Sequence, residues 1–393
     1  MTELLAWTSR RRTPPLSADA IMPGPLVVSG FLSDVTGIGR AGRLTLDAVR
    51  QWQPDVVAHD ALKDPAGVSL RGLPDGGVWI CHCNPPQILE LLAAGTDDLW
   101  ASRFRIGYWA YELPALPRSW HHALAYFHEI WAPSEFVADA IRRAGQGGGP
   151  VVKVVPHPLP ALHDVAVDRR VLPKPDAFTF LVMFDARSSF ARKNPMGALA
   201  AFQRAFRRND ASVSLVIKIV APESDAKSVS GLRKAIEGWS NIALSTEHLP
   251  DRQTLSLIAS ADCLVSLHRA EGFGLTIAES MALGTPAIVT GWSGNMQFCS
   301  EGVMEIPFNL VPAADPSGRY AGTGEKWADP NIGSAAEAMV RIRTDAVFRQ
   351  SLVDRARTLV HERLSPHISN GPYERFLATA DAVGGRRHAG SSH

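Results

Sequence analysis

Two glutamates, Glu271 and Glu279, stand eight residues apart around a glycine-rich turn and are the strongest chemical signal in the sequence. An apolar run predicts a strand before the turn, and a helical pattern begins near Leu275. Ligands of open α/β sheets bind at such carboxyl ends of strands. We expect the amides of Phe273, Gly274 and Leu275 to form an anion site at the helix N-terminus. Carboxylates beside an anion site suit sugar or ribose hydroxyls; alternatively, both glutamates only complement the helix dipole.

A second loop concentrates positive charge after another predicted strand, at Arg187, Arg192 and Lys193. Asn194 suits a helix N-cap and Pro195 the first helical position, so this loop also joins a strand to a helix. Lys193 and Arg187 are able to neutralise a diphosphate, the lysine as a point charge and the arginine by a two-pronged contact. We interpret Arg192 as a solvated surface charge, which is the usual fate of a lone arginine.

A third loop, at 290–295, follows a further strand and contains Ser293 and Asn295. Its glycines are compatible with a simple turn. Because the loop lies one strand–helix unit along the chain from Glu271, we predict that it closes one wall of the same pocket and contributes Ser293 and Asn295 to ligand binding.

A fourth glycine-rich stretch, Gly37, Gly39 and Gly42, matches the pattern G-x-G-x-x-G. A nicotinamide-binding fingerprint follows its strand directly, whereas residues 32–36 intervene here. We therefore interpret the stretch as a flexible loop at a cleft, where Gly37 and Gly39 cover the phosphates of a ligand.

The elements that position these loops are strands alternating with helices, the pattern of parallel α/β sheets. In the first block we predict strands at 26–31, 78–83, 104–109, 129–132 and 151–155, and helices at 38–51, 86–94, 118–127 and 134–144. In the second block we predict strands at 178–184, 214–220, 242–244, 263–267 and 287–290, and helices at 195–208, 225–239, 251–260 and 275–283. The fold class is thus α/β, with two Rossmann-like, doubly wound domains at 1–165 and 166–372 that face a cleft. A tail at 373–393 is compatible with packing back on the first domain.

Composition excludes several classes of function. Lys and Arg total 40 against 39 for Asp and Glu, a net charge of +1, so no overall field attracts nucleic acid. No apolar run approaches the roughly 20 residues that span a bilayer, and we expect a cytoplasmic protein. The cluster at Arg10, Arg11 and Arg12 leaves open a weak peripheral contact with the inner face of a membrane, although such a stretch is more often a solvated tail.

The sequence Cys81-His82-Cys83 is the one local cluster of metal-ligand types. Alternate residues on a strand share a face, and no second ligand pair follows at the spacing of a zinc finger. We therefore predict no metal site, and reduced, buried cysteines.

Residues 271–279 resemble the E-x7-E motif of the family 4 retaining glycosyltransferases, which have the GT-B fold. The motifs EGFGL and TGWSGN, with the stretches at 107–113, 130–134 and 192–195, are similar to one bacterial branch of that family. The resemblance implies that Glu271 binds hydroxyls of the transferred sugar and Glu279 the ribose. It further implies that Lys193 and Arg187 bind the diphosphate, although Arg187 falls six residues before Lys193 where the family usually has five.

The resemblance also implies a histidine in the first domain. His82 is out of register by one with the family's active-site histidine, so it is either catalytic or a satisfied histidine at a strand end. Asn84 and Glu112 are further candidates at the cleft. The catalytic candidates are thus Glu271, Lys193, Arg187 and His82.

These expectations describe a metal- and cofactor-independent hexosyltransferase that retains anomeric configuration. Its donor would be GDP-mannose or a UDP-sugar, and its acceptor a glycan or lipid-linked hydroxyl in surface polysaccharide or glycolipid synthesis. Two alternatives stay open. A non-catalytic nucleotide-sugar binding protein would keep Glu279 without needing Lys193, and an NAD-dependent dehydrogenase would bind its cofactor at Gly37 to Gly42 and give Glu271 no role.

Overall fold

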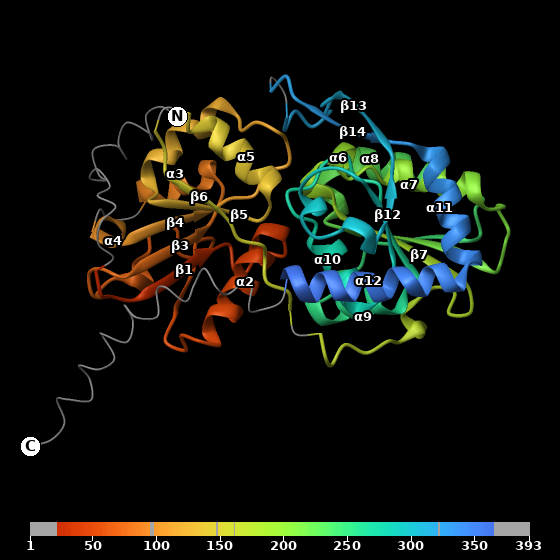
Figure 1. Ribbon diagram of the computed structural model, residues 1–393, viewed down its shortest axis with the longest axis horizontal. Helices are drawn as coiled ribbons and strands as arrows, with labels where there is room; N and C mark the ends of the chain where they lie inside the picture. The colour runs from red at the N-terminus through yellow and green to blue at the C-terminus, as the bar shows by residue number, and fades with distance from the viewer. Residues whose placement is uncertain (1–21, 95–97, 147, 161, 321–322, 365–393) are drawn as a thin grey trace, which may run out of the picture. The chain divides into compact units, whose positions relative to one another are not determined.

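The computed structural model describes residues 22–94, 98–146, 148–160, 162–320 and 323–364 (Figure 1). Contacts divide it into two compact units, the first comprising the described residues up to Pro158 together with Leu364, and the second covering Leu159–Arg363. We describe each unit by itself. The tail expected at 373–393 lies outside the described residues, and the boundary expected after residue 165 stays a prediction.

The first unit is built on a parallel sheet of six strands in the order β2-β1-β3-β4-β5-β6. The strands are β1 Leu26–Gly30, β2 Val57–Asp60, β3 Val78–His82, β4 Phe104–Tyr108, β5 Glu129–Ala132 and β6 Val151–Val154. The helices are α2 Gly37–Arg50, α3 Pro85–Ala94, α4 Asp98–Ala101 and α5 Glu135–Ala144. The central strands are mostly apolar because helices cover both faces of a parallel sheet, and Val28, Ile80 and Ile106 are fully buried.

The second unit repeats this plan with a parallel sheet in the order β12-β11-β10-β7-β8-β9. Its strands are β7 Phe178–Asp185, β8 Val213–Val220, β9 Ile242–Ser245, β10 Cys263–Ser266, β11 Ala287–Thr290 and β12 Met304–Ile306. Its helices are α6 Phe190–Lys193, α7 Pro195–Ala205, α8 Ala226–Ala235, α9 Asp251–Ser260, α10 Leu275–Leu283, α11 Ile332–Thr344 and α12 Ala346–Leu364. An antiparallel hairpin, β13 Phe308–Pro312 and β14 Lys326–Pro330, follows β12.

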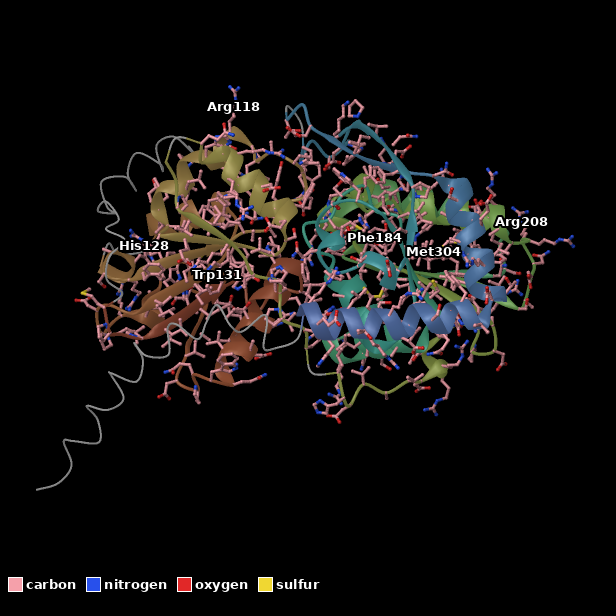
Figure 2. The ribbon with its side chains drawn as sticks, in the orientation of Figure 1. Arg118, His128, Trp131, Phe184, Arg208 and Met304 are labelled. Carbon is pink, nitrogen blue, oxygen red and sulfur yellow. The ribbon has the colours of Figure 1, made fainter. Side chains whose placement is uncertain are left out.

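Each unit has its own apolar core. Figure 2 shows Trp131 inside the first unit and Phe184 and Met304 inside the second, whereas Arg118 and Arg208 extend from the surface. The predicted α/β class with two Rossmann-like units is therefore confirmed. Helices long and apolar enough to cross a bilayer are absent from the part of the chain described by the structure.

Several sequence predictions of local structure were wrong or incomplete. The helix expected at 118–127 is a 3₁₀ helix at Arg118–Tyr126, in which the amide of Trp120 donates to the carbonyl of Pro117 three residues earlier. Helix α7 ends at Ala205 because Phe206 adopts an extended backbone and packs its ring on Phe202. Strands β2 and β12, the hairpin, and helices α4, α6, α11 and α12 were not predicted.

The stretch Gly37 to Gly42 is helical, so its interpretation as a flexible loop was wrong. Helix α2 begins at Gly37, and the hydroxyl of the N-cap residue Thr36 accepts the amide of Gly39 at 3.3 Å. A Cβ at Gly39 would lie 2.5 Å from the carbonyl oxygen of Asp34. This glycine therefore lets the first turn of α2 pack against the loop that precedes it.

Candidate functional site

Three loops of the second unit meet at the carboxyl ends of adjacent strands. Strand β10 pairs with β7 on one side and with β11 on the other, all in parallel. The loops that follow these strands, at 186–194, 267–274 and 291–295, therefore emerge at the same edge of the sheet. They are the three loops that the sequence singled out in this half of the chain.

Helix α6 is fixed to the loop that follows β10. The carbonyl of Arg192 accepts the amide of Arg269 at 2.7 Å, and the guanidinium of Arg192 donates to the carbonyl of Ala270 at 2.8 Å. The side-chain amide of Asn194 donates to the carbonyl of Leu267 at 2.9 Å. Three hydrogen bonds between segments more than 70 residues apart thus set the position of the basic side chains relative to Glu271.

The local sequence explains why α6 is so short. Ser189 has φ +73° and accepts the amide of Arg192 on its hydroxyl, which starts the helical turn. Asn194 has φ +51°, a left-handed conformation that asparagine tolerates, and accepts the amide of Gly197 at 3.1 Å. The predicted N-cap at Asn194 and the predicted first position of α7 at Pro195 are confirmed.

The carboxylate of Glu271 is held between two cations. The ammonium of Lys193 contacts Oε1, and Nη1 of Arg192 lies 3.2 Å from Oε2. Burial acts to raise the pKa of Glu271, but the charges of Lys193 and Arg192 outweigh it and lower the pKa to about 2. Glu271 is therefore ionised at neutral pH, with both oxygens engaged.

Arg192 was misjudged from the sequence, because it is 3% exposed rather than solvated. Its Nε donates to the carbonyl of Ser188 at 3.1 Å in addition to the contacts with Ala270 and Glu271. No local pattern separates it from its neighbour Lys193, whose side chain is 21% exposed. The nearest signal was its place in a basic pair after a strand.

Arg187 forms a two-pronged ion pair with Asp185, the last residue of β7. The distances are 3.0 Å from Nε to Oδ1 and 2.8 Å from Nη2 to Oδ2. Its charge is thus compensated within its own loop, and its predicted contact with a diphosphate stays a prediction.

The loop at 291–295 holds the backbone of Glu271. The hydroxyl of Ser293 accepts the amide of Glu271 at 2.8 Å, and the amide of Gly294 donates to the carbonyl of Glu271 at 2.8 Å. Asn295 is fully buried and contacts His268. The structure therefore brings this loop beside Glu271 and engages the side chains of Ser293 and Asn295 in contacts within the protein.

Helix α10 supplies an N-terminus next to this carboxylate. Gly274 is its N-cap with φ +93°, and the carbonyl of Gly274 accepts the amide of Ala278. The amides of Leu275 and Thr276, in the first helical turn, have no acceptor within the helix. Glu279 lies farther along α10 and is fully buried. The site thus combines a helix N-terminus, a partly exposed lysine and two carboxylates.

His82 ends β3 in the first unit and is 1% exposed. Its ring packs on Tyr108 with centroids 4.2 Å apart, and its Cβ lies 3.2 Å from where a Cβ of Gly30 would be. Burial, followed by the proximity of His157, lowers the pKa of His82 well below its usual value. Its Nε2 has no hydrogen-bond partner among the described residues, so it is a neutral, enclosed histidine rather than a satisfied one.

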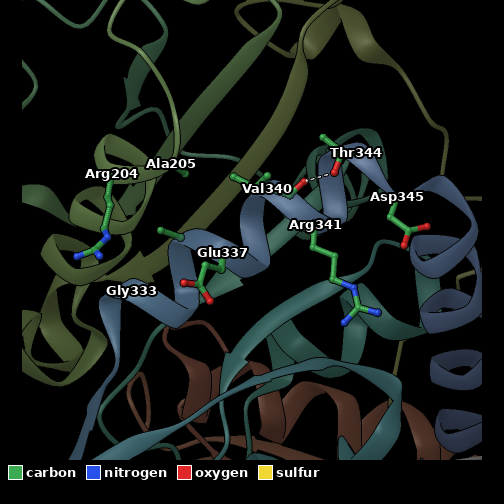
Figure 3. A pocket seen from close by; sticks show the side chains of 9 residues that line it. Arg204, Ala205, Gly333, Glu337, Val340, Arg341, Thr344 and Asp345 are labelled. Atoms are coloured by element: carbon green, nitrogen blue, oxygen red, sulfur yellow. Dashed lines mark hydrogen bonds between the residues drawn. The ribbon is translucent and has the colours of Figure 1, made fainter.

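A surface hollow of the second unit lies between α7 and α11, and no residue of the three loops lines it. Figure 3 shows Arg204, Gly333, Glu337 and Arg341 along its sides. Its charged side chains project from two helices, and none of the residues predicted to act in catalysis lines it. The hollow is therefore separate from the candidate site at the strand ends.

Comparison with known proteins relates most of the second unit to a family of glycosyltransferases. The model of the family "Glycosyl transferases group 1" matches residues 169–311, a span that contains all three loops. Comparison with curated proteins gives no match. Residues 169–311 are similar to the domain of this glycosyltransferase group.

Solved structures similar to the chain share its two-sheet architecture. Anabaena Alr3699/HepE in complex with UDP-glucose matches with a TM-score of 0.65 and 14% identity, over 91% of this chain and 100% of that chain. The α,α-trehalose 6-phosphate synthase from Burkholderia multivorans matches with a TM-score of 0.56 and 13% identity, over 92% of this chain and 79% of that chain. The fold is that of the GT-B glycosyltransferases.

Proposed function

We propose that this chain is a retaining glycosyltransferase that moves a sugar from a nucleotide-diphosphate donor to an acceptor hydroxyl. The observation that carries the proposal is the meeting of Lys193, Arg192 and Glu271 beside the N-terminus of α10. Cations and a helix N-terminus stabilise a diphosphate, and a carboxylate beside them accepts hydrogen bonds from sugar hydroxyls.

Arg192 and Lys193 differ in burial, and this difference supports different roles for the two side chains. Arg192 is enclosed and would stay on Glu271, which keeps this carboxylate ionised and oriented. Lys193 is the more exposed partner and would turn toward the diphosphate of the donor. Glu279, farther along α10, would bind the ribose, as the family resemblance implies.

In the proposed reaction the bond between the anomeric carbon and the diphosphate oxygen breaks while the acceptor oxygen bonds to the same face of that carbon. The acceptor proton passes to the departing diphosphate, so the configuration is retained. The demanding part is the separation of charge, and preorganised donors at the diphosphate reduce its cost. Lys193 and the first-turn amides of α10 would provide those donors, and no metal or cofactor enters the scheme.

UDP-sugars are a sound first choice of donor because the similar Anabaena structure is a complex with UDP-glucose. GDP-mannose remains the second choice from the sequence resemblance. For the acceptor we propose a glycan or lipid-linked hydroxyl, and for the protein a cytoplasmic location, with weak contact at the inner membrane face left as a separate proposal.

Release of UDP or GDP from a panel of nucleotide-sugars tests the proposal. We expect turnover of one donor by the wild type and loss of turnover in Lys193→Ala and Glu271→Gln. Binding of a nucleotide-sugar without turnover would favour the non-catalytic binding protein. Tight binding of NAD, insensitive to Glu271→Gln, would favour the dehydrogenase, although helix α2 starts at Gly37 rather than directly after β1.

A further inference from the structure

His268 lies two residues after β10 and is fully buried, with both ring nitrogens hydrogen-bonded. Nδ1 is 3.0 Å from the hydroxyl of Ser266, and Nε2 is 3.0 Å from Oδ1 of Asn295. The carbonyl of Trp292 also lies 3.4 Å from Nε2. His268 therefore links the end of β10 to the loop that follows β11.

The partners define which nitrogen carries the proton. The side-chain amide nitrogen of Asn295 donates to the carbonyl of Thr290, which leaves Oδ1 of Asn295 facing His268 as an acceptor. Nε2 of His268 must then be the donor, and Nδ1 accepts from the hydroxyl of Ser266. Burial lowers the pKa of His268, against the opposing effect of Glu271, so the ring is neutral at neutral pH.

His268 and the backbone of Glu271 both form hydrogen bonds with the loop at 291–295. Asn295 follows Ser293 and Gly294, and these two residues bind the backbone amide and carbonyl of Glu271. If residue 268 no longer bound Asn295, the loop at 291–295 and the backbone of Glu271 would be free to shift. A displacement of about 1 Å at a reacting centre lowers the reaction rate, even when the altered residue lies away from that centre.

We propose that His268, as the Nε2-protonated neutral tautomer, is a positioning residue that acts through Asn295 to fix Glu271 for sugar transfer. The inference rests on the proposed function of Glu271 and goes beyond it, because His268 is fully buried and would act through Asn295. It also reassigns Asn295 from donor binding to the support of this loop.

Replacing His268 by glutamine or by asparagine tests the roles of its two ring nitrogens separately. The amide nitrogen of His268→Gln reaches the place of Nε2 and keeps the donor to Asn295, whereas that of His268→Asn reaches only the place of Nδ1. We expect kcat for nucleotide-sugar hydrolysis to fall about 10- to 100-fold in His268→Asn and to stay within about threefold of wild type in His268→Gln. Equal losses in the two variants, or wild-type kcat in His268→Asn, would overturn the inference.

A second measurement needs no destabilised variant. Nitrogen-15 spectra of the imidazoles in the full chain, with His268→Gln used to assign the signal, should show a neutral ring protonated at Nε2 at pH 7. A charged ring, or one protonated at Nδ1, would overturn the proposed link to Asn295. The hydrolysis rate of Lys193→Ala is measured alongside. If this variant hydrolyses the donor as fast as the wild type, the proposed function is contradicted. If Lys193→Ala loses activity but His268→Asn does not, only the role of His268 is contradicted.

Discussion

Arg192 and Glu271, 79 residues apart in sequence, form a buried ion pair in which Nη1 lies 3.2 Å from Oε2. The same guanidinium binds the carbonyl of Ala270, so it holds both the side chain of Glu271 and the backbone just before it. Lys193, the next residue, takes the other oxygen of the carboxylate from a more exposed position. Two neighbouring cations thus have different surroundings and, we expect, different effects when removed.

Removal of Arg192 should mainly affect stability. Arg192→Met leaves the carbonyls of Ser188 and Ala270 without their donor and deprives buried Glu271 of one cation. We expect the free energy of unfolding to fall by about 2 to 4 kcal/mol in urea titrations. Arg252→Met, at a largely exposed arginine, is the control and should leave the urea midpoint unchanged. An unchanged midpoint in Arg192→Met as well would show that the buried contacts contribute nothing.

Removal of Lys193 should mainly affect turnover. Its ammonium is the cation free to move onto a diphosphate, so Lys193→Ala should lower the rate of donor turnover on the order of 100-fold. The matched control is Lys63→Ala, which removes a lysine that is 73% exposed in the first unit. Steady-state rates with the best donor measure both variants. Equal rates in Lys193→Ala and Lys63→Ala would remove Lys193 from the site.

The ion pairs of Glu271 should make the free energy of unfolding depend on pH in the acidic range. Its pKa falls from 4.5 to about 2 on folding, so the ionised form stabilises the fold above pH 4.5. That contribution is lost as the pH falls through the folded pKa. The difference in unfolding free energy between the wild type and Glu271→Gln should therefore be constant above about pH 5.5 and shrink between about pH 4.5 and 2.5. Denaturant titrations across this range measure it, and a difference independent of pH would contradict the assigned pKa.

The two ends of α10 offer a matched test of the anion site. Gly274 and Gly284 flank the helix with φ +93° and +82°, so alanine is strained at either position. Each alanine variant should lower the unfolding free energy by about 1 to 3 kcal/mol. Only Gly274→Ala, beside the first-turn amides, should also weaken binding of UDP or GDP in calorimetry. Equal affinities in the two variants would place the nucleotide elsewhere.

Much of the framework was predictable because its causes are local. Strands buried on both faces are mostly apolar, so the parallel sheets could be recognised. Asn194 and Pro195 predict the start of a helix, because asparagine is a favoured N-cap and proline suits the first helical position. The N-terminus of α10 could likewise be located, because a glycine such as Gly274 readily adopts the left-handed backbone conformation found just before the helix. The short elements that were missed, such as β2 and α6, have no periodic pattern, and the longer helices α11 and α12 were missed as well.

The sequence by itself therefore determined the α/β class, the strand ends, and the candidates Glu271, Glu279 and Lys193. Only the tertiary structure decided that β7, β10 and β11 are neighbours, which brings their loops together. It also decided that Arg192 is enclosed and Lys193 partly exposed. Burial depends on which distant segment packs against a side chain, and adjacent residues of the same charge give no local sign of that.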